Sequence, residues 1–453
     1  MTVTVTLRLV KGQLDRTEYV FDERTTCVLG RADECAPRLP NDRYHRTVSR
    51  HHCLLDINPP DARIRDFGSL NGTYVNGEKI GQRDAHQTPA EGAARSFPEH
   101  DLVDGDEIRL GQTVFRVDVR VPAKHPTLSL PRCAKCDREV GSELGSRSGQ
   151  YVCAACQSEP GAVAELLVDL ARSGKRELAP IAGYTLLREL GRGGMGAVYL
   201  ARHEDSGREV ALKVMLPKVA AGEAARARFF REVELTRTLR HPNVAELYDA
   251  GFAEGTFYFT TEYCAGGSLD QLLDRRDGRL ETAEAVRFAV QALDGLAHAH
   301  GEGIVHRDLS PHNILLSETD GSLVAKVGDF GLAKAFDNAG LSGLTRTGAT
   351  AGKPWFLPRQ QVVNFRNVSP AVDVWALAAC LYHALTGRYP RDFPRGKDPW
   401  QNILQADPVP IRRREPGVPR ALAGVIDDAL REDPHAPFQT AGELRQALLM
   451  HSF

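Results

Sequence analysis

Hydrophobic and polar positions follow different periods in different parts of the chain. Residues 1–13 read MTVTVTLRLVKGQ, and this alternation of apolar and polar positions predicts a half-buried strand. Short runs of β-type residues, broken by Gly, Asn, Asp and Pro, continue to about residue 121. The Asn-Gly of YVNGEKI marks a tight hairpin turn. We therefore predict an all-β sandwich over residues 1–121.

The pattern changes twice in the remainder of the chain. The stretch VPAKHPTLSLPR leads into a cysteine-rich segment, and AVAELLVDLAR, residues 162–172, has a helical period. We predict a small module over residues 130–158 and a linker helix within 159–182. From Tyr184 onward strand-like runs come first (YTLLREL, GAVYLAR, REVALKVM), and long helical patterns dominate after Ser268. This order predicts an α+β domain over residues 183–453.

Composition limits the classes of partner and the compartment. A chain of 453 residues is expected to form several domains, and its formal charge of −2 provides no general attraction to nucleic acid or anionic membrane. There is no signal-peptide pattern and no apolar run of about 18 to 20 residues, as a membrane span requires. We therefore expect a cytoplasmic protein that binds neither nucleic acid nor membrane. Its nine cysteines are then expected to be thiols or metal ligands rather than disulfides.

Four of the cysteines have the spacing of a metal site. CAKC and CAAC together form C-x2-C-x16-C-x2-C, which supplies two pairs of thiolates suited to tetrahedral Zn²⁺. The module resembles a zinc ribbon, and a redox pair is the rival interpretation. With four thiolates no coordination position stays open, so the zinc is expected to be structural. The predicted ligands are Cys133, Cys136, Cys153 and Cys156.

A glycine-rich stretch opens the α+β domain. GRGGMGAVYL, Gly191 to Leu200, lies between two strand patterns, and its glycines let the backbone approach phosphate oxygens closely. A flexible hairpin would give the same local pattern. The phosphate-binding interpretation gains weight because VALKVM follows, with Lys213 in an apolar strand where a charge needs a partner. Glu232, in a following helical run, is the candidate partner.

Two later stretches add groups suited to phosphoryl transfer. HRDLSPHN contains Asp308, which can accept a hydroxyl proton. Asn313 in the same stretch and Asp329 in VGDFG supply oxygen ligands of the kind that Mg²⁺ prefers when it also binds phosphates.

On these motifs residues 183–453 resemble the protein kinase superfamily, and GGMGAVY is similar to its bacterial Ser/Thr branch. The resemblance implies a two-lobed fold, with ATP in the cleft and Mg²⁺ on Asn313 and Asp329. It also implies that Asp373 is the structural Asp of the large lobe. Residues expected to act in catalysis are Lys213, Glu232, Asp308, Asn313 and Asp329. Residues expected to contact the nucleotide are Gly191, Gly193, Gly194, Gly196, Val198, Lys213, Glu262 and Cys264.

The chain departs from this pattern beside Asp308. Where the Ser/Thr branch has Lys it has Ser310, and where that branch has Thr it has Lys353, in AGKPWFLPRQQ. We hypothesise that the two residues have exchanged places, so that Lys353 returns a positive charge to the transferring phosphoryl. The alternative is a solvated Lys353 and a slow or inactive enzyme.

Other departures and candidates lie in and after the activation segment. Pro358, Arg359 and Gln360 replace Ala-Pro-Glu, and Pro437 replaces the Arg that pairs with that Glu, so both ends of one ion pair are absent. Arg307 is positioned to bind a phosphate on the activation segment. Candidate autophosphorylation sites in GLTRTGATAG are Thr345, Thr347 and Thr350.

The N-terminal segment contains VLGRADE, TVSRHHC and DFGSLNGTYVNG in order, and it resembles forkhead-associated (FHA) domains, which bind phosphothreonine. Phosphate capture on loops uses a guanidinium with short hydroxyl or amide donors. His52 is expected to brace the loops. A sandwich with ordinary polar turns is the alternative. Residues expected to contact a phosphopeptide are Arg31, Ser49, Arg50, Asn71, Thr73 and Asn76.

Together these observations predict an ATP- and Mg²⁺-dependent Ser/Thr protein kinase in signalling, with a phosphothreonine reader and a structural zinc module. Its expected partners are protein substrates with Ser or Thr, and phosphothreonine peptides or its own activation segment. The alternative is a phospho-dependent scaffold with a weak or inactive kinase-like domain. Ser310 favours the scaffold, whereas Lys213, Asp308 and Asp329 favour the enzyme.

Overall fold

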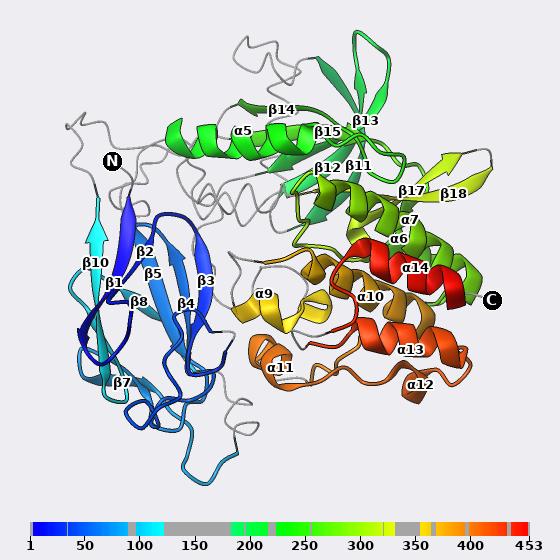
Figure 1. Cartoon of the computed structure of the whole chain (residues 1–453). Coiled ribbons are helices and arrows are strands. Elements are labelled where there is room, and N and C mark those ends of the chain that lie inside the picture. The colour runs from blue at the N-terminus through cyan, green and yellow to red at the C-terminus, as the bar shows by residue number, and fades with distance from the viewer. Residues whose placement is uncertain are drawn as a thin grey trace.

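The computed structural model shows a β-sandwich beside a two-lobed unit (Figure 1). The predicted cysteine module and linker helix lie outside the described residues. The structure describes residues 3–33, 35–88, 97–121, 183–193, 196–215, 223–253, 256–319, 321–330, 354–363, 368–394, 398–432 and 436–451.

The N-terminal part is an all-β sandwich, as predicted. One sheet has the order β2-β1-β10-β9-β6-β7 and the other β3-β4-β5-β8, with antiparallel pairing in both. Alternate side chains of the strands meet in a buried core that includes Leu7, Leu55 and Phe115. The strands are β1 (Thr4–Lys11), β2 (Glu18–Phe21), β3 (Thr25–Leu29), β4 (Cys53–Asn58), β5 (Asp61–Asp66), β6 (Thr73–Val75), β7 (Glu78–Gly81), β8 (His100–Leu102), β9 (Glu107–Leu110) and β10 (Thr113–Arg120).

The small lobe of the second unit is an antiparallel sheet with one helix. Its strand order is β11-β12-β13-β15-β14, and helix α5 (Glu223–Arg237) packs through Phe229 and Val233 against Phe257 and Phe259 of the sheet. The β-branched and aromatic runs of these strands account for their extended structure. The strands are β11 (Tyr184–Gly193), β12 (Gly196–His203), β13 (Glu209–Met215), β14 (Leu247–Ala253) and β15 (Thr256–Glu262).

The large lobe is mainly helical. Helix α10 (Ala371–Thr386) is buried along most of its length, and it packs with α7 (Thr282–Gly301) and α14 (Ala441–His451) in one apolar core. A small sheet of order β16-β17-β18 lies between this core and the small lobe (Figure 1). Its other elements are β16 (Gly267–Ser268), α6 (Leu269–Arg275), η2 (Pro311–Asn313), β17 (Ile314–Thr319), β18 (Ser322–Val327), η3 (Pro354–Phe356), α9 (Arg359–Val363), α11 (Pro399–Gln405), α12 (Ile411–Arg414) and α13 (Arg420–Ala429).

The sandwich packs against the large lobe, which was not predicted from the sequence. In Figure 1 the sheet that contains β3 and β4 faces α9 and α11. Arg65 of β5 forms an ion pair with Asp398, the residue that caps α11, and each side chain is only 4% exposed. The apolar side chains buried between the two units are Val28, Ala32, Cys35, Leu54 and Phe67 of the sandwich and Leu357, Val362, Val363, Ile403 and Leu404 of the large lobe.

Candidate functional site

The loop that contains Asp308 is held by a buried carboxylate. Asp373 of α10 is 1% exposed, and it accepts hydrogen bonds from the backbone N–H groups of His306 (2.7 Å) and Arg307 (2.8 Å). His300 Nε2 contacts the same carboxylate at 2.8 Å. Arg307 adopts a φ of +68°, a left-handed conformation that costs free energy for a residue other than glycine. Asp373 therefore stabilises a strained loop from beneath.

His306 joins this loop to the one that contains Asp329. Its Nδ1 accepts a hydrogen bond from the backbone N–H of Asp308 (3.2 Å), so its Nε2 donates to the carbonyl of Gly328 (2.8 Å). The N–H of Gly328 in turn donates to the carbonyl of Asn313 at 2.8 Å. These bonds place the backbones of the two acidic loops side by side.

The amide of Asn313 and the carboxylate of Asp329 are the oxygen donors of this region. Asn313 Nδ2 donates to the backbone carbonyl of Asp308 at 2.6 Å, which leaves its Oδ1 as the atom suited to a cation. Lys213 Nζ on β13 lies 2.7 Å from Asp329 Oδ2. Asp329 has a φ of +57°, and the following Phe330 packs its ring against His306. Small and large lobes therefore meet through a charged pair.

Glu232, the predicted partner of Lys213, lies on α5, but its side chain is outside the described residues. The pairing of Glu232 with Lys213 therefore stays a prediction. In this structure the lysine pairs with Asp329 instead, a contact that was not predicted.

The glycine-rich stretch forms the end of the β11–β12 hairpin, at one edge of the small-lobe sheet. Gly191 pairs with Val198, and Gly193 pairs with Gly196, at the ends of β11 and β12. Gly194 lies outside the described residues. A Cβ at Gly191 would meet no atom within 4 Å, so glycine is not required there by packing against the described residues. The backbone of this hairpin is therefore open to a ligand on that side.

The segment predicted to meet adenine follows β15. The Glu262 carboxylate pairs with Lys326 Nζ of β18 at 2.9 Å, so this side chain has a structural partner. Cys264 is buried, and burial raises the pKa of its thiol to about 12, which keeps it neutral. A ligand here would therefore meet backbone groups rather than charged side chains.

The ion pair that the family forms at the end of the activation segment is replaced here by another ion pair. Gln360 and Pro437 stand where the family has the two ends of its ion pair, and the structure shows a different ion pair nearby. The buried carboxylate of Glu432, 6% exposed, contacts the guanidinium groups of Arg359 (3.5 Å) and Arg391. In this ion pair the arginine is on α9 and the glutamate follows α13, the reverse of the family's arrangement. The pair stabilises this part of the large lobe.

The exchange between Ser310 and Lys353 is not visible in the structure. Ser310 is buried, at 5% exposure, and directly precedes η2. Lys353 lies outside the described residues, as do Thr345, Thr347 and Thr350 and the four cysteines Cys133, Cys136, Cys153 and Cys156.

A second polar site lies on the loops of the sandwich. The N–H of Arg31 donates to the carbonyl of Ser49 at 3.1 Å, and its Nε donates to the carbonyl of Val48 at 2.5 Å. Ser49 Oγ accepts from the N–H of Leu70 at 3.2 Å, and Asn71 Nδ2 donates to the carbonyl of Thr47 at 2.7 Å. A Cβ at Gly30 would collide with the Arg50 carbonyl, so only glycine allows this close approach. These contacts gather Arg31, Ser49 and Asn71.

His52 braces these loops. It is fully buried, and its Nδ1 accepts from the N–H of Ser49 at 3.0 Å while Nε2 lies 3.2 Å from the carbonyl of Gly72. Burial lowers the pKa of His52 despite the nearby Asp66, so the neutral ring is favoured.

Two predicted peptide contacts have structural roles here. Thr73 is 0% exposed and donates its hydroxyl to Asp66 Oδ2 at 2.6 Å, so its contact with a phosphopeptide stays a prediction. Asn76 has a φ of +50°, and both atoms of its amide are engaged, with Asp106 Oδ1 at 2.7 Å and the N–H of Glu107 at 2.9 Å. Its amide braces the β6–β7 turn against the neighbouring strand, which is the turn chemistry of an Asn-Gly pair.

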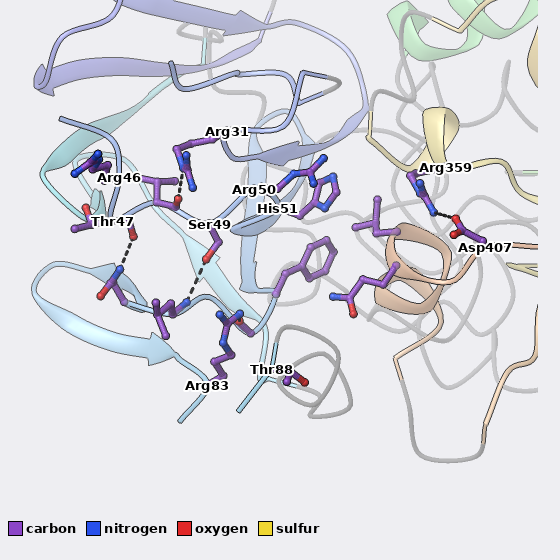
Figure 2. Close-up of a pocket in the computed structure, with 17 residues that line it drawn as sticks. Arg31, Arg46, Thr47, Ser49, Arg50, His51, Arg83, Thr88, Arg359 and Asp407 are labelled. Atoms are coloured by element: carbon purple, nitrogen blue, oxygen red, sulfur yellow. Dashed lines mark hydrogen bonds and ion pairs between the residues drawn. The ribbon is translucent and has the colours of Figure 1, made fainter. Parts of the chain in front are cut away.

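A cavity of about 700 Å³ opens over the loops around Arg31 (Figure 2). The predicted residues Arg31, Ser49, Arg50 and Asn71 line it. Other lining residues had not been predicted, and these include Arg46, Thr47, Arg83 and, from the large lobe, Arg359, Leu404, Gln405 and Asp407. Arg46 and Thr47 belong with Ser49 to the basic run RTVSR, which was a usable signal, whereas Arg359 is far away along the chain.

Two kinds of feature are absent from the described ranges. None of the helices there is long and apolar enough to cross a membrane. In the same part of the chain, no three His, Cys, Asp or Glu side chains come together as a group that could hold a metal ion.

Comparisons with known proteins match both parts of the chain. A family model described as a protein kinase domain matches residues 184–438, and one described as an FHA domain matches residues 27–91. The chain is 35% identical over 272 residues to serine/threonine-protein kinase PknJ of Mycobacterium tuberculosis, covering 59% of this chain and 45% of that protein. It is 34% identical over 261 residues to serine/threonine-protein kinase PrkC of Bacillus subtilis, covering 58% and 39%.

Among solved structures, a double mutant of the Mycobacterium tuberculosis PknI kinase domain aligns with a TM-score of 0.49 and 27% identity, over 60% of this chain and 96% of that one. The chain spans less than half the length of the two curated relatives.

Proposed function

This chain belongs to the protein kinase family, and from that premise we propose that it transfers the γ-phosphoryl group of ATP to serine or threonine hydroxyls of proteins. The observation that carries the proposal is the bonding around Asp373, which holds the loop of Asp308 and Asn313 beside Asp329. Phosphoryl transfer depends mainly on positioning and on charge stabilisation, so a rigid loop of this kind is what the reaction needs.

The donor set fits Mg²⁺ and a triphosphate. Asn313 Oδ1 and the Asp329 carboxylate are hard oxygen ligands, and the ammonium of Lys213 beside Asp329 supports a cation at this carboxylate. Mg²⁺, when bound, neutralises charge on the phosphate oxygens. Lys213 would then turn to the phosphates, with Glu232 as its partner, while Asp308 orients the substrate hydroxyl and accepts its proton.

We further infer that Lys353 supplies the positive charge that Ser310 cannot. The buried position of Ser310 beside η2 supports a structural role for this serine. The competing function is a phospho-dependent scaffold, which the absence of a lysine at position 310 favours.

One experiment separates the enzyme from the scaffold. The full chain is incubated with labelled ATP, Mg²⁺ and a library of Ser- and Thr-containing peptides, beside an Asp308→Asn variant. Label in the peptides that depends on Asp308 supports the kinase, and no label above background in either sample would favour the scaffold.

For the sandwich we propose binding of phosphothreonine peptides, and the FHA match and the loops of Arg31, Ser49 and Asn71 support this. Candidate ligands include the chain's own activation segment, phosphorylated at Thr345, Thr347 or Thr350, in the same chain or in another copy. Loss of self-association in Arg31→Ala after autophosphorylation would support this docking, and unchanged self-association would exclude it.

For Cys133, Cys136, Cys153 and Cys156 we propose a structural zinc site, on their spacing alone. One zinc per chain by elemental analysis, reduced when Cys133 and Cys153 are changed to Ser, is the expected result. A chain that contains no zinc after purification without chelators would refute it.

A further inference from the structure

The cavity over Arg31 has walls from two domains. One wall consists of sandwich loops, and the other is formed by Arg359 of α9 together with Leu404, Gln405 and Asp407 at the end of α11 (Figure 2). Its volume of about 700 Å³ is in the range of ligand-binding pockets, so it has room for several side chains of a peptide. A peptide bound through Arg31 would therefore lie against the large lobe as well.

The cavity has a large excess of positive charge. Five arginines line it, namely Arg31, Arg46, Arg50, Arg83 and Arg359, whereas Asp407 is its one acidic lining residue and the buried Glu432 contacts Arg359. Among the described residues, Arg46 and Arg50 form no ion pair, and Arg31 and Arg83 donate hydrogen bonds to uncharged oxygens. A single phosphothreonine supplies a charge of about −1.5 to −2 at pH 7, which is less than the combined positive charge of the four sandwich arginines.

Arg359 has buried contacts that fix its position and one exposed ion pair that a ligand could replace. Its backbone N–H donates to Glu432 Oε1 at 2.5 Å, its Nε donates to the carbonyl of Ile403 at 3.3 Å, and Nη2 lies 3.5 Å from the buried Glu432 carboxylate. The remaining contact is with Asp407 Oδ1 at 3.3 Å, and this aspartate is 87% exposed. An exposed ion pair of this kind contributes little, so a ligand anion can displace Asp407 while Glu432 keeps the guanidinium in place.

We propose that Arg359 of the kinase domain is a specificity-determining residue of the phosphothreonine pocket, and that the preferred ligand is a phosphothreonine peptide with a second anionic group near the phosphothreonine. This inference rests on the proposed reader function of the sandwich. The second anion is either the carboxylate of an Asp or Glu or the phosphate of a second phosphothreonine.

The chain's own sequence distinguishes these sources. Residues 338–353, which contain the three candidate threonines, include no Asp or Glu. If the activation segment is the ligand, the second anion must therefore be a second phosphate. A foreign partner would be free to use a carboxylate.

The test is binding of oriented phosphothreonine peptide libraries to the full chain, after phosphatase treatment. One flanking position at a time is fixed as Asp, phosphothreonine or Asn. At one or more positions the wild type is expected to bind the Asp or the phosphothreonine library about tenfold more tightly than the Asn library, as a charge-assisted hydrogen bond allows. Arg359→Gln is expected to lose this preference and still to require the central phosphothreonine.

The variants Asp407→Asn and Arg359→Gln together show whether a failed test concerns Arg359 or the reader function itself. Asp407→Asn removes the competing carboxylate, so it is expected to tighten binding of the doubly anionic library about threefold or more; it also decides the case if Arg359→Gln does not fold. Unchanged preference in Arg359→Gln, unchanged affinity in Asp407→Asn, or no preference in the wild type would overturn the inference. If the wild type binds no phosphothreonine library, the reader function itself is wrong.

Discussion

Individual side chains decide whether this kinase domain is active. Family members of the Ser/Thr branch carry a lysine two residues after the catalytic aspartate, and here that position is Ser310. The bonding of the catalytic loop through Asp373 and His306 is intact in spite of this change. The loss of the positive charge at position 310 therefore affects the side chains at the site and does not change the fold of the loop.

Replacing Lys353 by Thr tests the exchange hypothesis. If Lys353 stabilises the transferring phosphoryl group, its loss is expected to lower kcat on the order of 10²-fold, as the loss of one electrostatic donor does. Steady-state phosphate transfer to a peptide measures this, and Lys79→Thr on the sandwich is the control. An undiminished kcat in Lys353→Thr would eliminate the exchange.

The buried ion pair of Glu432 gives a stability prediction. Glu432→Gln removes the carboxylate that faces Arg359 and Arg391, so two guanidinium groups lose a buried counter-charge. The expected decrease in the free energy of unfolding is about 3–5 kcal/mol, measured by urea denaturation. Asp407→Asn, which also removes a partner of Arg359 but from an exposed position, should cost less than about 1 kcal/mol. Equal effects of the two changes would show that burial does not matter here.

His52 predicts a pH dependence of the sandwich. Because burial lowers the pKa of His52, the unfolded chain, with a His pKa of about 6.5, binds more protons than the folded chain below that pH. The free energy of unfolding should therefore fall as the pH drops below about 6.5, and fall less steeply in His52→Gln than in the wild type. Urea midpoints between pH 7.5 and 5.5 measure this, with the exposed His86→Gln as control. Identical slopes in wild type and His52→Gln would contradict it.

At the scale of elements, the junction of β5 and α11 joins the two domains. Asp398 accepts from the N–H groups of Trp400 (2.9 Å) and Gln401 (3.2 Å) through Oδ1, and its Oδ2 faces Arg65. One carboxylate thus caps a helix and pairs with the neighbouring domain. The apolar cluster around Phe67 and Leu404 surrounds this contact with buried surface.

Asp398→Asn tests this junction, because Asn still caps the helix but removes the charge. It should lower the free energy of unfolding by about 3 kcal/mol, since the guanidinium of Arg65 stays buried without a counter-charge. Combining it with Arg65→Met should recover most of the loss, a coupling that a double-mutant cycle measures. Strictly additive losses would mean that the two side chains do not interact.

The elements themselves were largely predictable, and their arrangement was not. Alternation in residues 4–11 and the Asn-Gly turn identified strands, and HRDLSPHN and VGDFG identified the loops around Asp308 and Asp329, because these signals are local. Arg65 and Asp398 are separated by 333 positions, and no local pattern connects them. The burial of Thr73 was not predictable for a similar reason, because a motif identifies the residue type but not whether the side chain points outward.

For the whole molecule, the reader pocket opens where the sandwich meets the large lobe. Arg31 and Arg359 line the same cavity although they belong to different domains. A phosphorylated ligand bound there would contact both domains at once. Helix α9, which begins at Arg359, packs through Val362 and Val363 against the sandwich, so it joins the pocket to the large lobe.

The central claim is that the chain transfers phosphate to Ser or Thr. The most direct measurement is phosphoamino acid analysis after the purified full chain has reacted with γ-labelled ATP and Mg²⁺, with Asp308→Asn beside it. We predict label in phosphoserine or phosphothreonine that falls by at least about 10²-fold in Asp308→Asn. Label found only as free phosphate, or unchanged in Asp308→Asn, would contradict the account.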